Sequence, residues 1–375
     1  MVGDSNFYFH FLTPQIRIAL AFAIAIVLNS FAIPVIVYIA KFKKLFEVES
    51  ENGVMLQSIP TIGGLGIFAS FVIVSLTLIN TCGLNGNSSC LQSLSPIIAG
   101  TALVFFIGMK DDLLDVSYWK KMLVELLALF IIVVVGEVRI NSLQGMFSFF
   151  ELRYSASVLL SMLVGFIIIN ALNFMDGIDG LAASLALLGS VVFGVFFITS
   201  ADWEYAILSF TLFGSLIPFL YFNIFGKTNK LYLGDTGSLI IGFILAVLVF
   251  RYNQLNSSIL YKHYFAAAPA FSFAVVIVPM FDIVRVFALR IFHRENKFKA
   301  DRRHLHYILV DIGLTHLQST ILLLSVNLVF IAFAYFFNSL GNSRLMYIMV
   351  TAIIAFTFIA IWIRRRKNML REAGF

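Results

Sequence analysis

Eleven apolar runs, most of them long enough to cross a membrane as helices, occupy most of this sequence. A helix needs about 20 residues to span the hydrocarbon of a bilayer. Only 12% of the 375 residues are charged, against about 25% in a soluble domain. We therefore expect an all-α polytopic integral membrane protein, a single domain over residues 1–375, with spans near residues 16–40, 61–79, 95–109, 119–136, 155–172, 181–199, 205–222, 237–250, 265–289, 320–337 and 345–363. Because the third and eighth runs are short, a count of ten stays open.

Lysine and arginine gather in alternate loops, which predicts the orientation because cytoplasmic loops carry their excess. In the eleven-span arrangement, 20 of the 26 fall on one side. The N-terminus is expected outside and the C-terminus in the cytoplasm. The first run is expected to stay in the protein, since it lacks the basic start and cleavage site of a signal peptide. This topology and attraction to anionic lipid explain the formal charge of +6, so nucleic-acid binding is not expected.

The two cysteines, Cys82 and Cys90, both lie in the polar segment TCGLNGNSSC, which the predicted topology places outside. A disulfide bond between them is compatible with an oxidising compartment. Two unpaired thiols are the alternative left open, because a sequence does not give the geometry that the bond requires. Neither the spacing nor histidine neighbours indicate a metal site.

Polar motifs that interrupt the apolar runs all fall on the predicted cytoplasmic side. They lie near residues 41–60, 110–120, 170–181, 223–237 and 290–318, and the segment PTIGGLGIF (Pro60 to Phe68) joins them. An ionised Asp in hydrocarbon costs about 2.5–3.5 kcal/mol, so acids in such places usually face a polar cavity. The outer loops carry no comparable cluster. We therefore expect one site that opens to the cytoplasm.

The motif GMKDDLLD, Gly108 to Asp115, contains three acids. Asp111 and Asp112 are adjacent, so on a helix they diverge by about 100° and cannot share one face. One could hold a metal ion while the other meets a second substrate, and Asp115 completes an acidic turn. Three like charges repel one another unless a cation lies among them. A solvated acidic loop is the alternative, which the apolar surroundings disfavour.

The motif NALNFMDGIDG places four polar residues at intervals of three: Asn170, Asn173, Asp176 and Asp179. On a helix, the first three project to a similar side and form a polar stripe at membrane depth. Either asparagine alone could simply hydrogen-bond across a helix bundle. That interpretation does not explain the whole set.

Two further motifs indicate phosphate binding. In YLGDTGS, Asp235 lies between two glycines just before an apolar helix, whose N-terminus favours phosphate. In DRRHLHY, His304 and His306 follow Arg302 and Arg303, whose guanidinium groups bind phosphoryl oxygens bidentately. Zinc is not expected there, because no third ligand of typical spacing follows. A merely positive loop would explain the arginines but not the histidines.

Together these motifs resemble the polyprenyl-phosphate N-acetylhexosamine-1-phosphate transferase superfamily, which includes the WecA, TagO and MraY types. The resemblance covers about Pro60 to Leu314 and rests on DDxxD, NxxNxxDGxDGL, GDTGS and HxH in matching order. It implies that a UDP-N-acetylhexosamine, with UDP-GlcNAc as the expected donor, gives its sugar 1-phosphate to a polyprenyl (undecaprenyl) phosphate, with release of UMP. It also implies Mg²⁺, with Mn²⁺ as a substitute, and a place in the bacterial inner membrane at the start of lipid-linked glycan synthesis. Relatives are often dimers, and a homodimer is left open here.

The resemblance also assigns roles to individual residues. It implies that Asp235 is the principal metal ligand, joined by Asp112, and that Asp111 contacts or deprotonates the lipid phosphate. Asp176 and Asp179 match acids that position the nucleotide or act in catalysis. The remaining assignments are substrate contacts by the two asparagines of the stripe and by the histidines and arginines of the last motif, together with Lys121 and Asn223.

Departures from the family pattern limit these assignments. Tyr307 stands where HxHH has its last histidine, which is closer to the MraY type, and Ala300 replaces a frequent proline. Asn223 precedes Asp235 by two residues more than usual. Asp115 stands where the MraY type typically has lysine, so an N-acetylhexosamine donor is favoured over the muramoyl-pentapeptide donor. A single and a double displacement both stay open, as does the choice of sugar. A cation-coupled transporter is disfavoured because its acids would lie near the middle of the bilayer.

Overall fold

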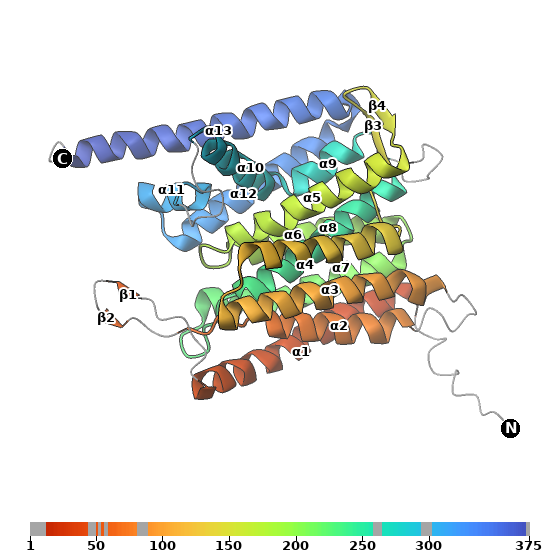
Figure 1. The fold of residues 1–375 in the computed structure, drawn as a ribbon, viewed down its shortest axis with the longest axis horizontal. Coiled ribbons are helices and arrows are strands. Elements are labelled where there is room, and N and C mark those ends of the chain that lie inside the picture. The colour runs from red at the N-terminus through yellow and green to blue at the C-terminus, as the bar shows by residue number, and fades with distance from the viewer. Residues whose placement is uncertain are drawn as a thin grey trace.

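The computed structural model describes residues 13–43, 50–51, 54–55, 59–80, 89–257, 265–293 and 302–372. It is a bundle of helices that run side by side (Figure 1). The helices are α1 (Pro14–Lys43), α2 (Gly64–Asn80), α3 (Ser89–Leu114), α4 (Tyr118–Phe130), α5 (Tyr154–Met175), α6 (Leu181–Thr199), α7 (Trp203–Phe225), α8 (Gly234–Leu255), α9 (Ala268–Val275), α10 (Ile277–Phe292), α11 (Leu305–Ile312), α12 (His316–Phe336) and α13 (Asn342–Glu372). A π-helical turn, η2 (Ile131–Val135), continues α4, and a 3-10 turn, η3 (Asn338–Leu340), precedes α13.

Among the residues that the structure describes, strands are confined to two small antiparallel hairpins at opposite ends of the bundle (Figure 1). In one hairpin, β1 (Ser50–Glu51) pairs with β2 (Val54–Met55). In the other, β3 (Ser142–Met146) pairs with β4 (Phe149–Glu151), and the register shifts between its two paired ends. The structure therefore confirms the predicted all-α membrane class.

Helices cover all eleven predicted runs, but they differ in how well each could cross a membrane. Among the described residues, seven helices are long and apolar enough, and a bent pair would make eight. The helix α2 is apolar but shorter, and α3 ends in the charged sequence of the DDxxD motif. The count of eleven spans and the orientation stay predictions. Cys82 lies outside the described residues, as does the side chain of Cys90, so the disulfide bond also stays a prediction.

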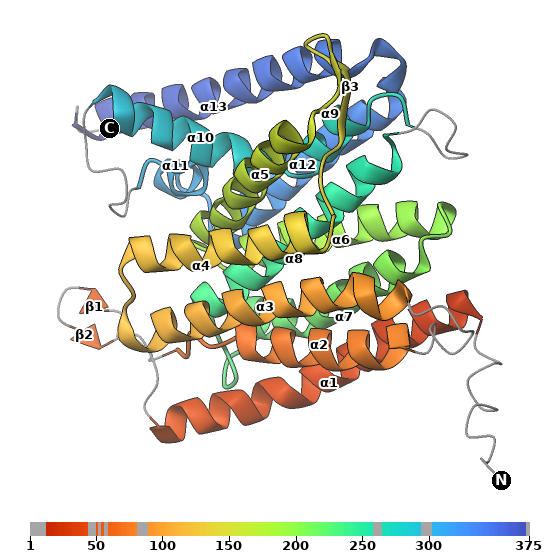
Figure 2. The ribbon, with the colours of Figure 1, turned by 45° about the vertical axis from the view of Figure 1, so that its right-hand side comes forward.

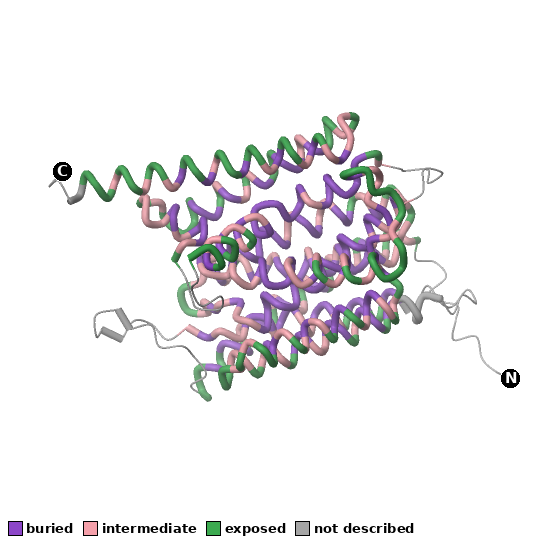
Figure 3. Tube along the Cα trace, turned by 45° about the horizontal axis from the view of Figure 1, so that its top comes forward, coloured by how far each residue is buried: buried purple, intermediate pink, exposed green. Residues whose placement is uncertain are grey.

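The helix α8 forms the centre of the bundle. In its most apolar window 83% of the residues are buried, against 22% for α13 at the periphery, a contrast that Figure 3 shows along the chain. Contacts with α2, α3, α5 and α6 surround it. Close approach depends on small residues: a methyl group on Gly242 would lie 2.7 Å from the Cα atom of Ile169 in α5. The helix that begins with GDTGS is therefore held firmly from several sides.

The run predicted as one span near 265–289 is instead broken. The helices α9 and α10 meet at an angle of 79° and α10 turns away from the axis of α9 (Figure 2). Pro279 has no N–H to donate to the carbonyl of Val275. Asn327 of α12 fills the gap, because its Nδ2 donates to that carbonyl at 2.9 Å and its Oδ1 accepts from the N–H of Val278 at 3.3 Å. A side chain from another helix thus satisfies the backbone where the helix breaks.

Candidate active site

Six aspartates from three motifs line one cavity of about 630 Å³. The wall also contains Asn173, Asn223, Tyr232 and Tyr307. The cavity lies at the end of the bundle where α3, α5 and α7 end and α8 begins. The three motifs therefore meet at one site, as predicted. The acids in its wall are Asp111, Asp112, Asp115, Asp176, Asp179 and Asp235.

The N-terminus of α8 is held by the carboxylate of Asp112. This carboxylate accepts hydrogen bonds from the N–H of Asp235 at 2.7 Å and from the N–H of Thr236 at 3.0 Å, and the Thr236 hydroxyl donates to it as well. The first N–H groups of a helix have no partner within the helix, so an acid from α3 supplies one. Asp112 thereby fixes the position of Asp235, a structural role that the sequence prediction did not include.

The backbone around Gly234 leaves no room for a side chain. Gly234 has a φ of +70°, and a methyl group there would lie 2.8 Å from Oδ2 of Asp112 and would collide with the carbonyl of Thr61. The segment that starts PTIGG runs beside Tyr232, whose N–H donates to the carbonyl of Pro60 at 2.8 Å and whose carbonyl accepts from Gly63 at 3.0 Å. Two motifs far apart in sequence therefore fix one tight turn.

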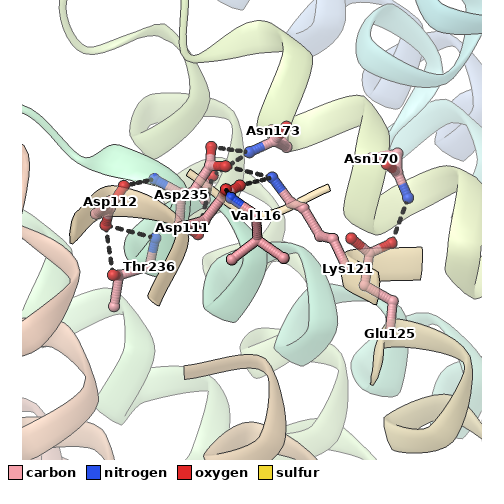
Figure 4. Close-up of polar contacts among 10 residues, drawn as sticks. Asp111, Asp112, Val116, Lys121, Glu125, Asn170, Asn173, Asp235 and Thr236 are labelled. Carbon is pink, nitrogen blue, oxygen red and sulfur yellow. Dashed lines mark hydrogen bonds and ion pairs between the residues drawn. The ribbon is translucent and has the colours of Figure 1, made fainter. Parts of the chain in front are cut away.

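Lys121 of α4 lies between two of the acids (Figure 4). Its ammonium group is 3.2 Å from Oδ2 of Asp111 and forms a second ion pair with Oδ2 of Asp235. The other oxygen of Asp235 accepts from Nδ2 of Asn173 at 2.7 Å, and the other oxygen of Asp111 accepts from the N–H of Val116 at 2.6 Å. Lys121 and Asn173 therefore lie beside the acids, and their predicted contacts with substrate stay predictions.

Asn170 faces a different neighbour. Its Nδ2 donates to Oε2 of Glu125 at 2.6 Å, and Glu125 is only 1% exposed (Figure 4). Sequence reasoning missed Glu125, although a single acid inside the apolar run of α4 was the signal that could have found it. Asn170 therefore lies behind the polar cavity, and its predicted contact with substrate stays a prediction.

Asp176 and Asp179 occupy different electrostatic environments. The pKa of Asp176 lies well above its usual range, because its carboxyl is desolvated and faces Asp235 and Asp112. Burial alone would also raise the pKa of Asp179, but the hydrogen bond with His316 and the ion pair with Lys230 at 2.7 Å outweigh it and hold that pKa below its usual range. Asp176 is thus suited to hold a proton, and Asp179 to stay ionised.

The HxH motif is buried beneath the cavity. Nδ1 of His304 lies 2.8 Å from Oδ2 of Asp282, a buried acid of α10 that sequence reasoning also missed. The same carboxylate accepts from the N–H of Leu305 at 3.1 Å and from Arg285 at 2.7 Å. His306 is fully buried, and burial lowers its pKa to about 3. His306 is therefore neutral, and Tyr307 beside it supplies the exposed surface of this motif to the cavity.

Of three predicted substrate residues, Asn223 lines the cavity, whereas Arg302 and Arg303 are not among its wall residues. The side chain of Arg302 is 74% exposed and pairs with Asp311 at 3.3 Å. The carbonyl of Arg303 accepts from Arg285 at 2.6 Å. Asn223 lines the cavity, but its Nδ2 donates to the carbonyl of Leu231 at 2.9 Å and closes the loop before α8. Their predicted roles in binding substrate stay predictions.

A second cavity, of about 500 Å³, lies between α4, α5 and α10 and is almost entirely apolar. Its wall includes Trp119, Phe166, Val284 and Phe287. Asn170, Arg290 and His304 are among its few polar wall residues. Because Lys121 and Glu125 lie on α4 and the two asparagines lie on α5, these helices separate a polar cavity from an apolar one.

The donor set of the polar cavity suits a hard divalent cation. The acidic side chains in its wall are all aspartates, whose carboxylate oxygens Mg²⁺ prefers. Mg²⁺ is usually coordinated by only one or two carboxylates, together with phosphate oxygens and water. Among the described residues, no three acidic, histidine or cysteine side chains are arranged to hold a metal by themselves. Asp235 and Asp111 fit the smaller requirement, since one ammonium group already bridges them. Asp112 fits less well, because its oxygens already serve the N-terminus of α8.

Comparison with known proteins agrees with the motifs. Residues 93–253 match the model of glycosyl transferase family 4. The chain is similar to proteins named undecaprenyl-phosphate alpha-N-acetylglucosaminyl 1-phosphate transferase. The one from Haemophilus influenzae is 28% identical over 281 residues, which cover 71% of this chain and 77% of that protein. The one from Salmonella typhi is 26% identical over 268 residues, and the one from Escherichia coli 24% over 272; each match covers 71% of this chain and 69% of the relative. These matches confirm the predicted resemblance: the chain is similar to glycosyl transferase family 4 over residues 93–253 and to these transferases over 71% of its length.

Proposed function

We propose that this protein transfers N-acetylglucosamine 1-phosphate from UDP-N-acetylglucosamine to undecaprenyl phosphate, releasing UMP and forming a lipid-linked sugar diphosphate. The observation that carries the proposal is the pair of cavities, one lined by acids and one apolar, whose walls include the neighbouring α5 residues Asn173 and Phe174. A soluble nucleotide sugar and a long lipid need two such compartments that meet at one point. The names of the relatives support the choice of sugar and acceptor.

The polar cavity is the proposed place of the nucleotide sugar. With Mg²⁺ bound at Asp235 and Asp111, the charge of the diphosphate would be neutralised and its phosphorus made more electrophilic. Asp176, whose pKa is raised by burial and by the neighbouring acids, is suited to donate a hydrogen bond to an anionic oxygen of the donor. The carboxylate of Asp179 pairs with Lys230, and its backbone carbonyl accepts a hydrogen bond from the hydroxyl of Thr320 in α12 at the rim.

The apolar cavity is the proposed place of the first isoprene units of the acceptor. Its aromatic and aliphatic wall can pack against them by van der Waals contacts, as apolar groups do within a membrane. The phosphate head then lies near Lys121 and Asn173, at the boundary of the two cavities. Lys121 can pair with the phosphate, which holds the attacking oxygen close to the donor.

In the single displacement, an oxygen of the lipid phosphate attacks the β-phosphorus of the UDP-sugar. A new P–O bond forms as the bond to the bridging oxygen breaks, and UMP leaves with that oxygen and its electron pair. A double displacement would pass through a carboxylate of this chain, and both routes stay open. Labelled enzyme that can be trapped after UMP release without acceptor would favour the second route.

The proposed location is the bacterial inner membrane, with the site on the cytoplasmic face, where nucleotide sugars are available. The excess of Lys and Arg in the loops at that end supports this orientation. A homodimer stays a prediction that the mass of the detergent-solubilised protein will check.

The test is a panel of UDP-sugars offered to the purified protein, with UMP release measured with and without undecaprenyl phosphate. We expect release that depends on UDP-N-acetylglucosamine, acceptor and Mg²⁺, and none from an inserted Asp235→Asn variant. Preference for UDP-MurNAc-pentapeptide would replace the proposed donor by that of the MraY type. Cation-coupled uptake into proteoliposomes without UMP release would overturn the transferase and support a transporter.

A further inference from the structure

Lys121 and Glu125 lie one helical turn apart on α4 and share the same surroundings (Figure 4). Residues at i and i+4 lie on one face of a helix. The ammonium group of Lys121 contacts Asp111 and Asp235 on one side. The carboxylate of Glu125 lies on the other side, where the amide of Asn170 donates to it at 2.6 Å.

Both side chains are buried: Lys121 is 8% exposed and Glu125 is 1% exposed. Glu125 acts electrostatically on Lys121, as Asp111 and Asp235 do. The ammonium group therefore contacts two carboxylates, and a third acidic side chain lies one helical turn further along α4.

The two carboxylates that Lys121 bridges are those proposed to hold the divalent cation. A metal ion and an ammonium group cannot occupy the same position between them, so the cation must displace Lys121. A buried ammonium group that loses its partners is strongly destabilised unless another anion receives it. Glu125 is fixed within reach by Asn170, and a lysine can turn toward a residue four positions on by changing rotamers alone.

We propose that Lys121 holds the place of the divalent cation in the metal-free site, and that Glu125 is a positioning residue that receives Lys121 when the cation binds. The inference rests on the metal dependence of the proposed function. It gives a role to an acid that none of the family motifs contains. It also explains why a lysine lies among acids that must bind a cation.

The test measures Mn²⁺ binding by electron paramagnetic resonance on the purified, substrate-free protein. Four chains are compared: the wild type, Glu125→Gln, Lys121→Met and the double variant. Gln keeps an oxygen that can accept the hydrogen bond from Asn170 but lacks the charge that receives Lys121. We expect Glu125→Gln to weaken Mn²⁺ binding about tenfold and Lys121→Met to strengthen it. In the double variant, most of the loss caused by Glu125→Gln should disappear.

The control is Asp115→Asn, which removes one negative charge from the same cavity. It measures how much Mn²⁺ binding depends on charge alone and should change the affinity less than Glu125→Gln. If Glu125→Gln weakens binding equally with and without Lys121, Glu125 acts on the metal directly and the proposal is overturned. No effect of Glu125→Gln in the wild-type background would also overturn it. Circular dichroism and gel filtration select variants that fold.

Failure of this inference is distinguishable from failure of the proposed function. The binding measurement contains neither nucleotide sugar nor lipid, so it does not depend on turnover. Coupling between Lys121 and Glu125 in a protein that releases no UMP would leave the inference standing and remove the transferase. Turnover without that coupling would support the transferase and overturn the inference. A wild-type chain that binds no Mn²⁺ would overturn the inference.

Discussion

Replacing Asp112 by alanine should loosen the start of α8 and thereby displace Asp235. The carboxylate of Asp112 accepts from two consecutive N–H groups of α8 and from the hydroxyl of Thr236. The methyl side chain of alanine cannot accept these hydrogen bonds. Because Asp235 is itself one of the two residues whose N–H is held, its carboxylate should shift with the backbone.

The expected magnitude follows from these contacts. Hydrogen bonds to a charged group contribute about 1.5–3 kcal/mol each, and loss of a helix cap costs about 0.5–2 kcal/mol. We expect Asp112→Ala to lower the free energy of unfolding by about 2–3 kcal/mol. A displacement of about 1 Å at a catalytic group can lower the rate about 10²-fold, so UMP release should fall by at least that factor. Thr236→Val, which removes only the hydroxyl bond, should cost about 1 kcal/mol.

The assay combines thermal unfolding in detergent, UMP release and Mn²⁺ binding for both variants and for the control Asp115→Asn. A lower unfolding temperature for Asp112→Ala, together with lost turnover, is expected. The opposite pattern would refute the reasoning: Mn²⁺ binding lost while the unfolding temperature stays that of the wild type. Asp112 would then be a metal ligand, as the sequence alone predicts.

Four further outcomes are expected. Chelation by EDTA should stop UMP release, and added Mg²⁺ should restore it; unchanged release would contradict a metal requirement. Phe287→Trp should raise the KM for undecaprenyl phosphate several-fold and leave that for the UDP-sugar unchanged, whereas equal rises would contradict separate cavities. Gly177→Ala should lower turnover, because its methyl group would strike Nε2 of His306; wild-type turnover would show that the loop yields. The lowered pKa of Asp179 gives stability that is present above about pH 3.9, the value for an unfolded chain, and is lost as the pH falls through the folded value. Asp179→Asn should therefore remove part of the acid unfolding followed by circular dichroism; an unchanged acid transition would show that Asp179 contributes nothing.

The fold class and the meeting of the motifs at one site could both be predicted from the sequence, and the reason is physical. Acids are expensive in hydrocarbon, so Asp111, Asp176 and Asp235 had to share a polar cavity wherever the chain brought them to one end of the bundle. What each acid does there depends on tertiary contacts. Asp112 is a neighbour of Asp111 in sequence, but it serves the backbone of α8, more than 120 residues away.

The break between α9 and α10 could not be read from the sequence. The run near 265–289 has the length and hydropathy of one span, and Pro279 alone permits a kink without requiring it. The sharp bend needs Asn327, which lies on another helix and satisfies the broken backbone. Glu125 and Asp282 each stand as an acid in an apolar run, but their partners Asn170 and His304 lie on other elements and could not be read from the sequence.

The bend between α9 and α10 has a kinetic consequence. It directs the apolar side chains of α10, among them the half-exposed Val284 and Ile291, into the wall of the second cavity. A lipid that enters there arrives by diffusion in the plane of the membrane, whereas the nucleotide sugar arrives from the water. The rate therefore depends on the concentration of the donor per volume of solution. For the acceptor, it depends on the mole fraction in the surrounding lipid. Growth of the membrane area at a constant amount of acceptor slows such an enzyme, even though nothing in solution has changed.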